Sequence, residues 1–286
     1  MLNFLALLVL QLEFAMALDL NALWDFSNPE FSEQRFKAAR ENATGDDFLI
    51  LSTQLARTYS LRKDYETARG VLSDIEQKMN AASPEAQVRY KLELGRTYVS
   101  AAHSGEPLDA QDVERARVLY LEEYEAAKAA ILDALAIDAL HMMAFVDTEP
   151  AAQLHWAEEA LALARASNSK DARKWEASLL NNAGMALHSL NRYEEALLQF
   201  EKALELRKQE SNAWTTHVAY WMVAWTLRSL DRTEEAIEIQ TRLAHEREIA
   251  GEPDAFVFEE LEILYRTIGD VERANHYSEK RKQLSR

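Results

Sequence analysis

The sequence has no cysteine and is poor in glycine and proline. Its 7 Gly and 5 Pro make 12 of 286 residues, about 4%, against roughly 12% in average proteins. Without cysteine, disulfides, thiolate metal sites and cysteine nucleophiles are excluded. Tight turns between strands use Gly and Pro to reach unusual dihedral angles, so the shortage of both argues against a β-rich fold.

Positive charge is also scarce. The chain has 32 Lys and Arg against 48 Asp and Glu, which gives a formal net charge of −16. Nucleic-acid binding draws most of its affinity from Lys and Arg residues that neutralise phosphates. Because the chain also has no long basic run, we expect no nucleic-acid partner.

The N-terminal segment 1–20 is apolar, but it is too short and too interrupted to span a bilayer. Its apolar core Leu5–Leu10, followed by Ala15-Met16-Ala17, resembles a signal peptide over residues 1–17, which would make the protein periplasmic or secreted. No Lys or Arg precedes the core, and a Gln and a Glu interrupt it. The alternatives are an amphipathic first helix packed on the rest of the chain or a misassigned start codon, and we favour a cytoplasmic location without a membrane span.

The chain is rich in helix-forming residues, with Ala, Leu, Glu, Arg and Gln dominating. Similar short segments recur along it, and the last three alanines that end them are 40 and 38 residues apart, a period typical of a repeated helix pair. The segments are Lys63-Asp-Tyr-Glu-Thr-Ala68, Asn191-Arg-Tyr-Glu-Glu-Ala196, Asp231-Arg-Thr-Glu-Glu-Ala236 and Gly269-Asp-Val-Glu-Arg-Ala274, with a shorter fifth, Asp112-Val-Glu-Arg-Ala116.

Each segment has a physical interpretation as the turn between two helices. Asp, Asn or Gly ends one helix and begins the next. The Glu residues then fall in the first turn of the second helix, where negative charge meets the positive end of the helix dipole. The alanine marks the place where two helices cross closely. The pattern therefore predicts antiparallel helix pairs.

The helix before each alanine carries apolar residues at helical spacing, such as Ala183, Gly184 and Leu187 before Ala196. This order of an Ala-Gly or Leu-Gly pair, a Leu or aromatic residue, an Ala and a later aromatic resembles the tetratricopeptide repeat family, most clearly over residues 180–203. The Trp and Pro of the family pattern are mostly missing. The resemblance implies an all-α, right-handed superhelical solenoid of about six antiparallel helix pairs.

We expect the solenoid to cover residues 46–286 and a capping helix to occupy residues 21–45. The second pair contains an inserted loop at residues 101–111, and the last helix is polar, as the exposed end of a solenoid must be. The resemblance says little about function, because the same fold supports many kinds of binding.

The sequence contains none of the catalytic patterns that we sought. The seven glycines are scattered, so no phosphate-binding loop or dinucleotide fingerprint is present. The seven His residues include no metal-ligand pair, and no nucleophile elbow occurs. Paired glutamates recur with the repeat and are interpreted as solvated helix surface. We therefore expect no enzyme activity, no cofactor and no metal.

In the tetratricopeptide repeat family the first helix of each pair lines a concave groove in which ligands lie. The resemblance places polar and aromatic residues there, and Asn182 matches the position at which many members hold a peptide backbone. The matching Gln54, Glu93 and Met222 interrupt any row of asparagines. The groove candidates are Arg57, Arg89, Arg96, Asn181, Asn182, Met185, His188, Trp221, Trp225 and Arg228.

Two features of these candidates suggest a partner. Arginines in an acidic chain would suit an acidic peptide, unless each is paired with a neighbouring Glu. Trp221 and Trp225 lie four residues apart on a helix that is apolar almost all round, so they line the groove unless neighbouring side chains cover them. A third possibility is that the N-terminal segment folds over them.

We therefore expect a protein–protein interaction scaffold that binds a peptide or partner protein in the groove. The alternative is a regulatory sensor in which a peptide changes the curvature of the solenoid. The sequence does not fix the oligomeric state.

Overall fold

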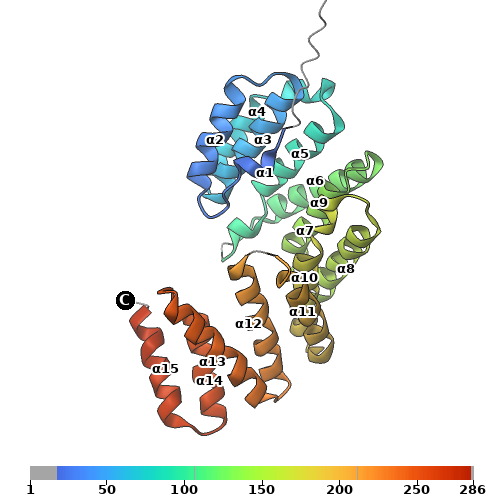
Figure 1. Ribbon diagram of the computed structural model, residues 1–286. Coiled ribbons are helices and arrows are strands. Elements are labelled where there is room, and N and C mark those ends of the chain that lie inside the picture. The colour runs from blue at the N-terminus through green and yellow to red at the C-terminus, as the bar shows by residue number, and fades with distance from the viewer. Residues whose placement is uncertain (1–17, 106, 211, 285–286) are drawn as a thin grey trace, which may run out of the picture.

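The computed structural model describes residues 18–105, 107–210 and 212–284, and every regular element within them is helical (Figure 1). The all-α prediction is confirmed, whereas the signal-peptide interpretation of residues 1–17 falls outside the described residues. The α-helices are α1 (Leu20–Leu23), α2 (Pro29–Glu41), α3 (Gly45–Leu61), α4 (Tyr65–Ser73), α5 (Pro84–Arg96), α6 (Ala110–Ala129), α7 (Asp133–Val146), α8 (Pro150–Ala166), α9 (Lys170–Arg173), α10 (Glu176–Ser189), α11 (Tyr193–Arg207), α12 (Ala213–Ser229), α13 (Thr233–Ile249), α14 (Ala255–Thr267) and α15 (Val271–Leu284).

The helices stack into an elongated solenoid, with α1–α5 at one end and α12–α15 at the other (Figure 1). Most helices pack chiefly against their neighbours in sequence, and two short 3₁₀ helices, Glu76–Ala81 and Ala101–His103, lie in the connections. The buried side chains form several clusters along the length of the solenoid instead of one central core. This is the quasi-one-dimensional packing of repeat proteins.

Left-handed residues end the first helix of several pairs. Asn191, Asp231 and Gly269 have φ of 59°, 58° and 79°, and in each turn the next N–H donates to a carbonyl five residues earlier, as in the Schellman motif. Lys63 has the same conformation. Ile131, with φ 59°, forms the same turn between α6 and α7, where the sequence gives no signal because β-branched residues disfavour this region.

The alanines of the recurring segments lie at close helix crossings, as expected. Ala68, Ala116, Ala196, Ala236 and Ala274 are all 0% exposed. Each side chain is enclosed by the facing helix, and a larger residue would push the two helices apart.

Two glycines, each on the first helix of a pair, also lie at close helix crossings, where they face an aromatic ring of the second helix. A methyl group on Gly184 would lie 2.6 Å from Cε1 of Phe200, and one on Gly95 would lie 2.6 Å from Cε1 of Tyr120. The hydroxyl of Tyr120 also donates to the carbonyl of Val99, at 2.6 Å. The ring of the second helix therefore fills the space that the missing Cβ leaves on the first.

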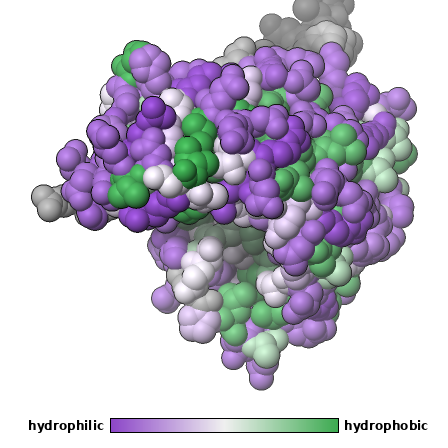
Figure 2. Space-filling view, turned by 90° about the horizontal axis from the view of Figure 1, so that it is seen from below, coloured by the Kyte–Doolittle hydropathy of each residue, from purple (hydrophilic) through white to green (hydrophobic). Residues whose placement is uncertain are grey.

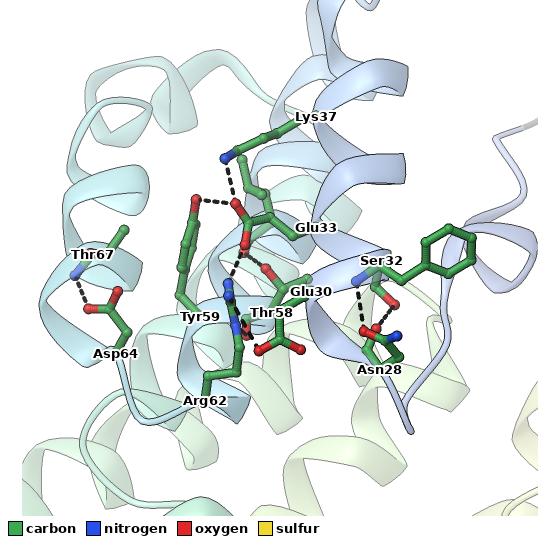
Figure 3. A network of polar contacts seen from close by, with 12 residues as sticks. Asn28, Glu30, Ser32, Glu33, Lys37, Thr58, Tyr59, Arg62, Asp64 and Thr67 are labelled. Atoms are coloured by element: carbon green, nitrogen blue, oxygen red, sulfur yellow. Dashed lines mark hydrogen bonds and ion pairs between the residues drawn. The ribbon is translucent and has the colours of Figure 1, made fainter.

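Helix α2 packs on α3 and is fastened there by polar contacts (Figure 3). Glu33 accepts from the Tyr59 hydroxyl at 2.9 Å and from Lys37 Nζ at 2.5 Å, and it forms an ion pair with Arg62. Although burial opposes its ionisation, these three partners lower the pKa of Glu33. Phe36 of α2 is fully buried against α3, so the first repeat is covered at its open end.

The inner face as candidate binding surface

Six of the described helices, α3, α5, α7, α10, α12 and α14, carry equivalent pairs of side chains three residues apart. The pairs recur 38 to 45 residues apart along the chain. We define the inner face by them: Gln54 and Arg57, Glu93 and Arg96, Asp138 and His141, Asn182 and Met185, Met222 and Trp225, and Glu260 and Ile263.

Ion pairs connect the first three inner helices. Arg57 Nη1 lies 3.8 Å from Glu93 Oε1, and Arg96 reaches both Glu93 Oε1 and Asp138 Oδ1 at 2.5 Å. Arg96, Glu93 and Asp138 are only 5%, 2% and 6% exposed. The second residue of each of the first two pairs thus contacts the first residue of the next pair, and we call this row of contacts the ladder.

The same register continues from α7 to α10. Asn182 Nδ2 lies 3.0 Å from His141 Nδ1. Burial lowers the pKa of His141, so the ring is neutral at pH 7 and its nitrogen can accept a hydrogen bond from the Asn182 amide. Asn182, matched above to a peptide-binding position, is therefore engaged within the protein.

Burial shapes the charges of the ladder. The pKa of Asp138 is lowered because Arg96 and Arg57 outweigh the cost of burial. The pKa of Glu93 is raised, since burial dominates there in spite of the same two arginines. Glu93 Oε2 and Arg57 Nε are buried without a hydrogen-bond partner among the described residues. Such groups are stable only while their charged neighbours stay in place.

The chain covers the inner face of α3 with its own aromatic side chains. Trp24 Nε1 donates to Gln54 Oε1 at 3.0 Å. The Arg57 guanidinium lies 5.6 Å from the Trp24 ring centroid and 5.4 Å from that of Phe26, and the two rings stack at 4.5 Å. The segment before α2 therefore occupies the N-terminal end of the inner face.

The C-terminal half of the inner face is aromatic. The Trp225 ring stacks on His188 at 3.5 Å between centroids, and Trp221 stacks on Trp225 at 5.8 Å. Both tryptophans are partly buried, whereas Met185 is 39% and Ile263 is 36% exposed. We call these five residues the aromatic surface. Its tryptophans are neither fully open nor fully covered.

Arg228 borders the aromatic surface without adding a free charge to it. Its Nε and Nη2 donate to the Glu260 carboxylate at 2.7 and 3.0 Å. Burial, with a smaller contribution from Arg228, lowers the pKa of His188 to about 4. His188 Nε2 lies 2.9 Å from Ser229 Oγ. At pH 7 the ring of His188 is therefore neutral.

Lowering the pH from 6.5 to 4 is expected to destabilise the wild type by about 1–2 kcal/mol more than His188→Gln, allowing for partial exposure of the ring. His188 of the unfolded chain gains its proton near pH 6.5, but the folded chain accepts it only near pH 4. The unfolded state therefore gains stability across this window. Urea unfolding of both proteins measures the difference. A His188 titration midpoint of 6.5 in NMR spectra of the folded protein would contradict it.

The structure places the predicted arginines close to carboxylates. Besides the ladder contacts and Arg228, Arg89 Nε donates to Glu85 Oε1 at 2.9 Å. Arg96 is only 5% exposed, so its guanidinium is not accessible to another protein or peptide. Asn181 is partly exposed, and Met185, His188, Trp221 and Trp225 come together as described. Each arginine among the groove candidates thus lies beside an acidic side chain of the same protein.

Sequence reasoning missed the contribution of the third helix pair. Asp138 and His141 were not among the groove candidates, although the spacing Asp-x-x-His repeats the spacing of Glu93 and Arg96. Ile263 of α14 was also not among the groove candidates. These residues could have been found from their spacing, because each belongs to a pair three residues apart that recurs on every inner helix. The residue types in the pairs differ, so the family signature residues do not reveal them.

The described residues contain no group of three or more His, Asp or Glu side chains that could hold a metal ion. Among the same residues, no helix is long and apolar enough to cross a membrane. A cleft of about 530 Å³ lies between α5 and α6, lined by residues outside the inner face such as Tyr98 and Arg115. Figure 2 shows hydrophobic residues in small groups among hydrophilic ones on one face, which is hollowed near its middle.

A family model described as tetratricopeptide repeat matches residues 177–213, which contain α10 and α11. This is the pair in which Gly184 faces Phe200. The match covers 37 of the 286 residues, so it identifies this helix pair as similar to a tetratricopeptide repeat. No match to this chain was found among curated proteins.

Solved structures share the fold of this chain at low sequence identity. RapI in its apo form matches with a TM-score of 0.68 and 14% identity over 92% of this chain and 74% of its own. A STAND ATPase from Pyrococcus horikoshii with a tetratricopeptide repeat sensor gives 0.66 and 16% over 89% of this chain, which spans 39% of the ATPase. NprR in complex with its cognate peptide NprX gives 0.54 and 13%, over 92% and 75%.

Proposed function

We propose that this protein is an interaction scaffold that holds a peptide or a partner protein on its inner face. The observation that carries the proposal is the row formed by Met185, Trp225 and Ile263. These residues occupy equivalent positions on three successive inner helices, and all three are partly exposed. Exposed apolar side chains that recur in register form a continuous apolar strip, and such strips mark interaction sites.

The two halves of the inner face suit different roles in such a scaffold. In the N-terminal half the equivalent positions are Arg57, Arg96 and His141, and each contacts the next inner helix. These contacts fix the relative positions of α3, α5, α7 and α10. A surface that is held in place before binding loses less entropy on association. The C-terminal half carries Trp221 and Trp225, and tryptophan is among the residues most enriched at binding hot spots.

Affinity capture from an extract of the native host tests the proposal. The bait proteins are the wild type, a Met185→Glu/Ile263→Glu variant and a Leu198→Glu control. Leu198 lies on α11 and is 49% exposed, so the control adds a charge at a similarly exposed apolar position off the inner face. We expect the wild type and the control to recover the same partner and the double variant to lose it. Equal recovery by all three baits would refute binding at this face.

A peptide-responsive sensor is the second candidate. It is favoured by the fold shared with NprR, solved with its cognate peptide, and with the STAND protein that has a tetratricopeptide repeat sensor. A sensor needs two conformations with different affinities for the peptide. X-ray scattering curves with and without a captured peptide separate the candidates, because a change in curvature is expected only for the sensor.

A further inference from the structure

The charges of the inner face are balanced by their own neighbours. Three guanidinium groups, Arg57, Arg96 and Arg228, face three carboxylates, Glu93, Asp138 and Glu260. A negatively charged ligand would have to displace one of these carboxylates and leave it without its partner, at a cost that its own ion pair must first offset. The inner face therefore offers little to an acidic peptide.

The aromatic surface itself carries no charge at neutral pH. Met185, Trp221, Trp225 and Ile263 have no ionisable group, and the partly buried His188 stacks on Trp225 in its neutral form. The guanidinium of Arg228, which borders them, is held by both oxygens of Glu260. An ionised side chain placed here would lose its hydration without meeting an opposite charge.

The inner face already receives an aromatic side chain at its other end. Trp24 lies on Gln54 and Arg57, which occupy the equivalent positions on α3, and its indole N–H finds an acceptor there. In contrast, the indole N–H of Trp221 is buried without an acceptor among the described residues. An indole N–H can only donate, so any acceptor that reaches it satisfies it, as the side-chain oxygen of Gln54 does for Trp24.

We propose that the aromatic surface binds an uncharged peptide segment through an aromatic or branched aliphatic side chain, and that it discriminates against acidic segments. This inference rests on the proposed scaffold function and specifies its ligand. The discrimination follows from the balanced charges of the ladder and from the neutrality of the five residues.

Selection of a phage-displayed library of random dodecapeptides on the full chain tests the inference. We expect the selected peptides to share an aromatic or branched aliphatic residue in an uncharged stretch. Synthetic copies should bind Met185→Glu/Ile263→Glu at least about ten-fold more weakly than the wild type, and Leu198→Glu as well as the wild type. Circular dichroism spectra establish that the variants keep their helices. A Met185→Ala/Ile263→Ala variant, which adds no charge, should bind with an intermediate affinity.

Four results would overturn the inference. Selection of acidic peptides, or equal binding by the double glutamate variant, would assign another chemistry or another surface while leaving the scaffold function in place. Selection that succeeds only on a chain without residues 1–17 would identify the chain's own apolar segment as the occupant. If no peptide is selected although host capture still depends on Met185 and Ile263, the ligand is a folded surface. Failure of the host capture itself would instead refute the proposed function.

Discussion

Replacing Arg96 with alanine is expected to lower the free energy of unfolding by about 3–5 kcal/mol. Arg96 is 5% exposed and bonds to both Glu93 and Asp138, which are themselves buried. Removing the guanidinium leaves two carboxylates without their main counter-charge, in a place that water hardly reaches. Urea denaturation followed by circular dichroism measures the loss.

A matched surface variant separates the buried ladder from ion pairs in general. Arg192 donates from Nε and Nη2 to the two carboxylate oxygens of Glu195, each at 2.7 Å, but its side chain is 46% exposed. Arg192→Ala should therefore cost less than about 1 kcal/mol. Replacing Arg96 by Met together with Asp138→Leu should restore part of the stability, because Asp138 is then no longer an unpaired buried charge and Glu93 keeps Arg57 as its partner. An Arg96→Ala loss no larger than that of Arg192→Ala would mean that water screens the ladder.

Gly184→Ala is expected to destabilise the protein by about 1–3 kcal/mol, although alanine is the better helix former. The added methyl group would lie 2.6, 2.8 and 2.9 Å from three atoms of the Phe200 ring. Phe200 is 1% exposed, so its ring cannot move aside without displacing other core residues. The cost of overpacking thus exceeds the gain in helix propensity. The midpoint and slope of urea unfolding measure the change.

Gly70 provides the control for this substitution. It lies within α4, and a methyl group there would have no heavy atom within 4 Å. Gly70→Ala should stabilise the protein by about 0.4–1 kcal/mol, since only the helix propensity and the freedom of the unfolded chain change. Combining Gly184→Ala with Phe200→Leu should recover part of the loss. If both glycine substitutions stabilised the protein, the crossing of α10 and α11 would be looser than the contact distances imply.

The fold was largely predictable from sequence because its information is local and repeated. Asn191, Asp231 and Gly269 mark turns by their own conformational preferences, and the alanines five residues later mark the crossings. The turn at Ile131 was not predictable, because isoleucine disfavours the left-handed conformation that packing imposes on it. Local sequence signals therefore predict the repeated helix pairs, whereas tertiary packing determines the backbone conformation of the turn at Ile131.

The candidate site was only partly predictable. The family resemblance placed Trp221, Trp225 and His188 on one surface, but it could not show that their rings stack. The partners of Arg57 and Arg228 lie on other helices, more than 30 residues away in the chain. Such pairs depend on the rotation of one helix relative to the next, which sequence periodicity does not specify.

The ladder also constrains how this chain can change by gain or loss of whole repeats. Each contact between helices uses one residue from a repeat and a complementary residue from the next. If α5 were followed by a copy that lacks the carboxylate of Asp138, Arg96 would lose one of its two carboxylate partners. Between α10 and α12 no such polar contact joins Met185 and Met222 among the described residues. Duplication, deletion or exchange of repeats at this junction would therefore leave no ladder charge unpaired, but the helix that follows α10 would still have to supply the contacts that Trp225 and Ser229 make with His188.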